Sequence, residues 1–238
     1  MINILIQSAL MSFGRLLILP MRRIFWRIFA ISLSCLIIFW LLIRHVFALY
    51  FIHFISPLIG NVSLTLGWIG VLALISLIFG ISHLLYILLC PLITFIGSFF
   101  ADNIIAIIEK KDFATHTLGK AMTIVESILF GLRFFFLAIF GNIIALMLYF
   151  IPPIHLLGFY LVNGYIFGRT YFMINALRFS NYSLAHQLFQ DNWALVFCAG
   201  IIIAIISAIP LFGIITPVFA PIFMCYIYKN IKGARLIL

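Results

Sequence analysis

Long uninterrupted apolar runs dominate the hydrophobic pattern along this chain, and short polar links separate them. Six such runs cover, approximately, residues 28–55, 66–89, 122–151, 154–168, 193–209 and 218–228. Apolar and polar positions do not alternate within them, so the pattern predicts helices and not the strands of a barrel. The preceding segment, 1–20, mixes apolar residues with Gln, Ser and Arg, which is typical of an amphipathic helix at a membrane surface.

The last three apolar runs are short for a helix that crosses a bilayer. A full span needs about 20 apolar residues to cross about 30 Å of hydrocarbon, whereas these runs have 15, 17 and 11 residues. At about 1.5 Å per residue, the last reaches only about 17 Å. Proline turns join the runs in pairs: Pro152 and Pro153 stand between the third and fourth runs, and Pro210 and Pro217 between the fifth and sixth. We therefore predict two helical hairpins that enter the bilayer and return, with a plain six-helix membrane bundle as the alternative.

These features predict an all-α integral membrane protein with a single membrane domain, 1–238. Its fold is two long transmembrane helices plus two half-membrane helical hairpins. Gly164 and Gly168 stand in a GxxxG spacing, which permits close packing between helices. The predicted segments are an amphipathic N-terminal helix (1–20), two long membrane helices (26–100), a cytoplasmic loop (101–121), a first hairpin (122–177), a polar loop (178–192) and a second hairpin (193–232).

Composition and charge place the protein in the membrane and orient it. The chain is 66% hydrophobic and 8% charged, against about 45–50% and about 25% in soluble domains. The basic residues, which give a formal charge of +9, gather in links that alternate with the charge-free links 56–65, 152–155 and 210–217. Because cytoplasmic loops carry the excess of Lys and Arg, both termini and the charged loops are predicted to be cytoplasmic. This charge is attributed to contact with lipid and not with nucleic acid.

The acidic residues and cysteines argue against several chemistries. All five carboxylates lie in or beside polar links, whereas an ion-driven carrier usually places an acid inside the membrane. Asp102 and Glu109, seven residues apart, share one face of a predicted helix that leaves the membrane. The four cysteines are scattered, and no hydrolase, metalloprotease or nucleotide-binding motif is present. We predict no enzyme activity, no cofactor and no metal site.

Three arginines stand out as candidates for holding an anion: Arg22, Arg23 and Arg133. Arg22 and Arg23 precede the first long run, where a helix N-terminus and two guanidiniums make a good oxyanion site. The same pattern also fits a purely positive-inside anchor. Arg133 lies about eleven residues into the third run, where a buried cation needs an anionic partner. Alternatively, Arg133 lies at headgroup depth, with Glu126 below it on the helix.

Several stretches resemble one family of membrane proteins. They are "PMRR", "CPLITFIGSFFADNIIAIIE", "NGYIFGRTYF" and "NWALVFCAGIIIAIISAIPLFGIITPVFAPIF". Over about residues 12–232 the chain resembles the CysZ-type sulfate permeases, whose membrane domain is shared with the etoposide-induced protein. The resemblance implies two long helices, two half-membrane hairpins, a homo-oligomer in the bacterial inner membrane, and a sulfate site whose arginine pair matches Arg22 and Arg23. Where that family has a glycine-led loop, this chain has Leu19, Pro20 and Met21.

Together these observations predict an inner-membrane anion permease or channel. Its partners are the lipid bilayer and a small inorganic anion such as sulfate, and transport proceeds without proton coupling. Arg22 and Arg23 gather the anion, Arg133 and Arg169 lie along its path, and the proline tips shape that path. The alternative is a non-transporting scaffold of the same fold that organises lipid or protein partners, in which the arginines serve only as anchors.

Overall fold

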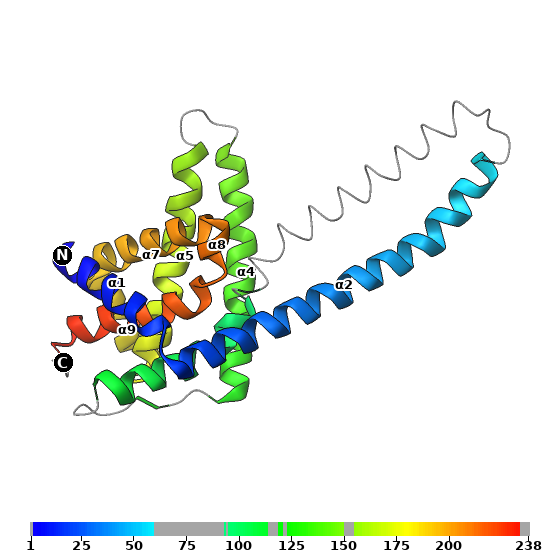
Figure 1. Cartoon of the computed structure of the whole chain (residues 1–238). Coiled ribbons are helices and arrows are strands. Elements are labelled where there is room, and N and C mark those ends of the chain that lie inside the picture. Colours follow the sequence, from blue (N-terminus) through cyan, green and yellow to red (C-terminus); the bar gives the residue numbers. More distant parts are fainter. Residues whose placement is uncertain are drawn as a thin grey trace. The chain divides into compact units, whose positions relative to one another are not determined.

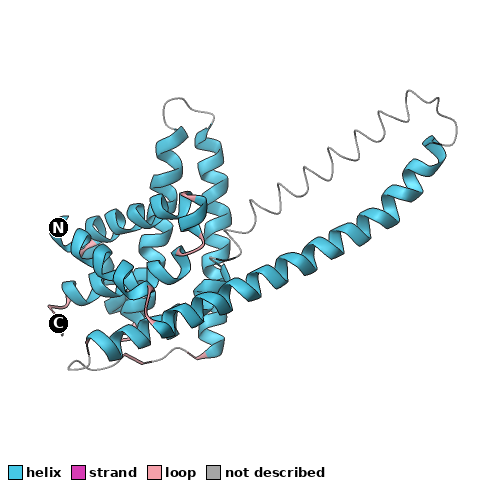
Figure 2. Cartoon of the chain, in the orientation of Figure 1, coloured by secondary structure: helices cyan, strands magenta, loops and turns pink. Residues whose placement is uncertain are grey.

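The computed structural model of the chain describes residues 2–59, 93, 95–113, 119–120, 123–149 and 155–233. Figure 2 shows helices joined by short turns and loops, and these ranges contain no strand. The prediction of an all-α protein is thereby confirmed. The predicted second long helix, 66–89, and the tip prolines Pro152 and Pro153 lie outside these ranges.

The described helices fall into two compact units, Met1–Ile28 with Ile93–Leu238, and Phe29–Leu92. A further helical segment, 95–112, precedes α4 and carries no label in Figure 1. The labelled helices are α1 (Ile2–Leu16), α2 (Leu19–Ile59), α4 (Ile124–Tyr149), α5 (His155–Leu177), α6 (Tyr182–Asp191), α7 (Trp193–Ala208), α8 (Pro210–Gly213) and α9 (Thr216–Ile231).

Helix α2 is the longest described helix, with 41 residues. It begins at Leu19, well before the apolar run that starts at residue 28. Within the described residues, Leu19–Leu42 is the one single helix whose length and composition suffice to cross a membrane. The pair α6 and α7 passes the same test when taken together, but it bends by 85°.

Helices α4 and α5 form an antiparallel pair in the first unit (Figure 1). Helix α4 has 26 residues and α5 has 23. The fourth apolar run therefore does not make a short helix, because α5 continues through the polar end of that run to Leu177. At about 1.5 Å per residue, α5 is about 35 Å long. Helix α7, with 16 residues, is short as predicted.

Glycines let α5 and α7 approach closely. A Cβ added at Gly200 on α7 would lie 1.8 Å from the carbonyl oxygen of Gly164 on α5. A Cβ added at Gly168 would lie 2.6 Å from the carbonyl oxygen of Val196. Because only glycine avoids these overlaps, the GxxxG spacing of α5 marks the contact face with α7.

Helix α9 forms the centre of the first unit, with every residue from Thr216 to Lys229 buried. Helix α1 packs along it (Figure 1). Pro210 begins α8 and Pro217 lies in the first turn of α9, where a proline removes no helical hydrogen bond. Pro217 packs against Gly97, where an added Cβ would approach the Pro217 Cβ to 2.2 Å.

Two segments differ from the sequence prediction, and a third is more buried than predicted. Residues 101–112, predicted as a helix that leaves the membrane into the cytoplasmic loop 101–121, are helical, and they carry buried side chains such as Ile104 and Ile108. Helix α6 lies inside the predicted polar loop 178–192; Asn181 caps it by accepting from the Leu184 N–H. The sixth run extends from 11 to 16 residues, so that Lys229, predicted to lie at a charged helix end, is 5% exposed within α9. Local periodicity did not predict the burial of Lys229, because its partner Glu109 lies in a distant part of the chain.

Candidate anion-binding site

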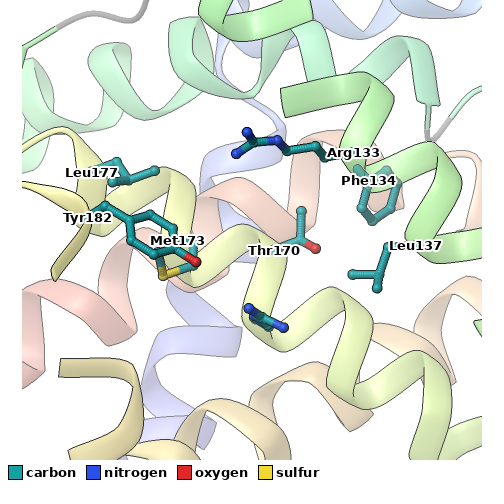
Figure 3. A pocket seen from close by; sticks show the side chains of 8 residues that line it. Arg133, Phe134, Leu137, Thr170, Met173, Leu177 and Tyr182 are labelled. Carbon is teal, nitrogen blue, oxygen red and sulfur yellow. The ribbon is translucent and has the colours of Figure 1, made fainter. Parts of the chain in front are cut away.

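A pocket of about 240 Å³ opens between α4, α5 and α6. Figure 3 shows Arg133 and Thr170 in its middle, with Phe134 and Leu137 towards one end. Both sequence-predicted pathway arginines line it, together with two hydroxyl side chains and a rim of apolar ones. The lining residues are Arg133, Phe134, Leu137, Arg169, Thr170, Met173, Leu177 and Tyr182.

The hairpin geometry explains why these two arginines line the same pocket. Arg133 stands nineteen residues before Pro152, and Arg169 stands sixteen residues after Pro153. In an antiparallel helical pair, positions at similar distances from the turn lie at similar depth, because each residue adds about 1.5 Å. This spacing is a signal in the sequence that pairs Arg133 with Arg169.

The polar groups of the pocket are largely unpaired. Arg133 is exposed and makes no hydrogen bond or ion pair within the described part of the chain. One nitrogen of Arg169, Nη1, donates to the Tyr165 hydroxyl at 3.0 Å, and its guanidinium lies 5.8 Å from that ring centre. Thr170 is 6% exposed, and its hydroxyl has no hydrogen-bond partner among the described residues. The pocket therefore presents donors that the surrounding fold does not occupy.

None of the five side-chain carboxylates, all of them described, pairs with Arg133 or Arg169. Glu126 instead forms a capping box with Thr123, whose backbone N–H donates to Glu126 Oε2 at 2.8 Å. Glu126 is thus occupied at the start of its own helix, and the alternative that Arg133 lies at headgroup depth stays a prediction. Asp191 ends α6 and is exposed. The other three acids lie in a buried ionic network.

Arg178 is the centre of this buried ionic network, which joins 95–112 to the end of α5. Its guanidinium pairs with Asp102, and its Nη2 lies 3.0 Å from Glu109 Oε2. Burial lowers the pKa of Arg178, but the hydrogen bonds and charges of Glu109 and Asp102 outweigh it, so the pKa is raised. The backbone N–H of Gly119 adds a further hydrogen bond to Glu109 Oε2 at 3.2 Å. Arg178 therefore stays charged although its side chain is 2% exposed.

Two more cations complete the network. Lys229 Nζ lies 3.8 Å from Glu109 Oε1 and 4.0 Å from the ring centre of Phe179. On α1, Arg15 Nη2 pairs with Asp112 Oδ1 at 2.7 Å, and the Tyr226 hydroxyl donates to the same carboxylate. The network ties α1, α5 and α9 to the segment 95–112, and its acids are matched by bases.

This network was not predicted from the sequence. Its signal was the placement of Asp102, Glu109 and Asp112 on one face of an otherwise apolar helix. Their partners were not predictable from local spacing, because Arg178 lies 76 residues from Asp102 and 69 from Glu109. Among the described residues, no group of three His, Cys, Asp or Glu side chains is arranged to hold a metal ion.

Arg22 and Arg23 lie in the first turns of α2 and are both exposed. The helix begins three residues before Arg22, whose backbone N–H already donates to the Ile18 carbonyl at 3.1 Å. Pro20 has no N–H, so this helix start has fewer free donors than the sequence analysis assumed. The neighbouring Met21 and Ile24 are buried, so the two exposed arginines are not part of the packed face of this turn.

The described residues are helical, and they include one helix that is long and apolar enough to cross a membrane. Together with the hydrophobic composition and the pocket lined by Arg133 and Arg169, this defines the class as a helical membrane protein with a basic pocket. The family model described as "Sulfate transporter CysZ/Etoposide-induced protein 2.4" matches residues 9–217. The chain belongs to this family of sulfate-transporter-like membrane proteins, as the sequence resemblance predicted. Searches among curated proteins and among solved structures returned no match.

Proposed function

We propose that this protein is a permease or channel of the bacterial inner membrane for a sulfate-like oxyanion, working without proton coupling. What supports it is the pocket that brings Arg133 and Arg169 together with no carboxylate partner. Membership in a sulfate-transporter family makes an oxyanion the natural ligand for such a pocket. The exposed pair Arg22 and Arg23 gathers the anion, and the pocket arginines lie along its path.

In this proposal the chain is one membrane domain, with two long helices, two helical hairpins and its termini in the cytoplasm. The helices of the first hairpin, with 26 and 23 residues, are long enough to cross the bilayer, so only the second is proposed to be a half-membrane hairpin. The protein works as a homo-oligomer. The short helices α7 and α9, with 16 residues each, support a second hairpin that does not cross. At about 1.5 Å per residue, each is about 24 Å long, against about 30 Å of hydrocarbon. Pro210 and Pro217 stand at its tip.

The test is uptake of labelled sulfate, and separately of labelled phosphate, into liposomes that hold the purified protein. The matched variant is Arg22→Lys with Arg23→Lys, because lysine keeps the anchoring charge but loses the planar fork that grips an oxyanion bidentately. We expect saturable sulfate uptake in the natural protein and about tenfold less in the variant. A variant with unchanged uptake would show that the pair only anchors the helix. No uptake of either ion by folded protein would overturn the proposed function in favour of the scaffold.

A further inference from the structure

Two groups of cations in the first unit differ in charge balance. In the buried network, the cations Arg15, Arg178 and Lys229 each lie within 4 Å of a carboxylate. In the pocket, Arg133 and Arg169 line one cavity that has no acidic residue in its wall. Like charges that share a partly enclosed site repel each other and favour the entry of an anion. The positive charge of the pocket is therefore available to a ligand from outside the chain.

We propose that this pocket is a binding site for a tetrahedral oxyanion, a sulfate or phosphate group that is either a free ion or the headgroup of an anionic lipid. Guanidiniums suit this ligand because their N–H groups form a planar fork that matches two oxygens of the group. The hydroxyls of Thr170 and Tyr182 add neutral donors from the same wall. The role of the site as a step in permeation rests on the proposed function, whereas the binding itself does not.

The size and the apolar rim of the pocket fit the oxyanion both as a free ion and as the headgroup of a lipid. A cavity of about 10–15 Å³ holds one water on the same measure, so about 240 Å³ has room for a five-atom oxyanion and several waters. Figure 3 shows apolar side chains at both ends, with Phe134 and Leu137 at one and Met173 and Leu177 at the other. Basic pockets between membrane helices with such apolar flanks also accept lipid headgroups.

The first experiment measures binding of labelled sulfate and labelled phosphate to the full chain in a neutral detergent. All samples carry Arg22→Lys and Arg23→Lys, so that the proposed gathering site does not contribute. The test variant adds Arg133→Gln and Arg169→Gln, and the control adds Arg27→Gln, which removes an exposed arginine that does not line the pocket. We expect the test variant to bind about tenfold more weakly or worse, and the control to bind unchanged.

The second arm tests the lipid source. The same proteins are placed in nanodiscs of phosphatidylcholine with a minor fraction of phosphatidylglycerol, and the lipids retained after extraction are counted by native mass spectrometry. Retained phosphatidylglycerol that is lost with Arg133→Gln and Arg169→Gln identifies a lipid headgroup as the ligand. Sulfate or phosphate binding that is lost in the first arm identifies the free ion. Either result supports the site.

The site is overturned if the glutamine pair binds free anion and retains anionic lipid as the arginine pair does, or if neither probe binds the arginine pair at all. Should the glutamine pair fail to fold, Thr170→Val and Arg133→Lys give the same comparison, because each alters one donor group and keeps the side-chain volume similar. Pocket-dependent binding without liposome uptake would support the site and count against the permease. Uptake that does not change with the glutamine pair would support the permease and count against the site.

Discussion

Replacing Gly200 by alanine tests whether α5 and α7 approach as closely as the structure indicates. The added Cβ would lie 1.8 Å from the Gly164 carbonyl oxygen, whereas ordinary contacts begin at 3.4 Å. The two helices must therefore separate by about 1.6 Å at this point, the difference between these two distances. That separation also loosens the neighbouring contacts of Gly168 and Val196. A gap of even about 0.5–1 Å forfeits a quarter to a half of each dispersion contact.

The expected loss of stability follows from these distances. Overpacking of this kind costs about 1–3 kcal/mol, and a backbone oxygen cannot rotate away as a side chain can, so we expect the upper part of that range. The matched control is Gly14→Ala in α1, where an added Cβ meets nothing within 4 Å. There the same substitution should stabilise the helix by up to about 1 kcal/mol, because alanine is the better helix former.

The assay is thermal unfolding of both variants in the same detergent, followed by circular dichroism at a fixed heating rate. A loss of about 1 kcal/mol shifts the midpoint by about 2–4 °C in a chain of this size. We expect Gly200→Ala to melt about 4–10 °C below the natural protein and Gly14→Ala at or slightly above it. A Gly200→Ala variant that melts as the natural protein does would refute the close crossing.

Three further outcomes are expected from the same unfolding assay. Arg178→Leu should lose about 3–5 kcal/mol, because Asp102 and Glu109 then stay buried without the Arg178 guanidinium, and Glu109 keeps only Lys229 at 3.8 Å. Arg169→Leu, which breaks no ion pair, should lose less than about 1 kcal/mol. Since the pKa of Arg178 is raised, its stabilising effect is present below its ordinary value and lost only above it, so the Arg178→Leu deficit should be equal at about pH 7 and about pH 10. Asn181→Ala should cost about 1 kcal/mol by removing the cap on the Leu184 N–H, and Asn181→Asp, which keeps an acceptor, should restore it.

Local patterns in the sequence predicted individual helices well. The apolar run 193–209 corresponds to α7 (Trp193–Ala208), and the run 122–151 corresponds to α4 (Ile124–Tyr149). Hydrophobic content identifies such helices because each is apolar over its full length. The same reasoning placed the end of α9 too early, since Lys229 interrupts the apolar run yet is buried beside Glu109 and Phe179.

Contacts between distant segments were harder to predict from the sequence. The arginines of the pocket were identified one at a time, and their common cavity depends on the antiparallel register of α4 and α5. The buried network depends on pairs far apart in the chain, such as Arg15 with Asp112, separated by 97 residues. A single sequence contains the residue types for such pairs but not their distances, so the helix that carries the acids was predicted but their burial and their partners were not.

The distribution of the carboxylates bears on how an anion permease of this kind operates. An acid that carries a proton across a membrane must exchange it with both sides, and therefore cannot remain bound to a fixed cation. Asp102, Glu109 and Asp112 are each held by an arginine, and Glu126 is occupied in its own helix cap. Asp191, the fifth acid, is exposed at the end of α6. With all the side-chain acids so placed, none lines the pocket of Arg133 and Arg169, and this placement supports the proposal that the permease works without proton coupling.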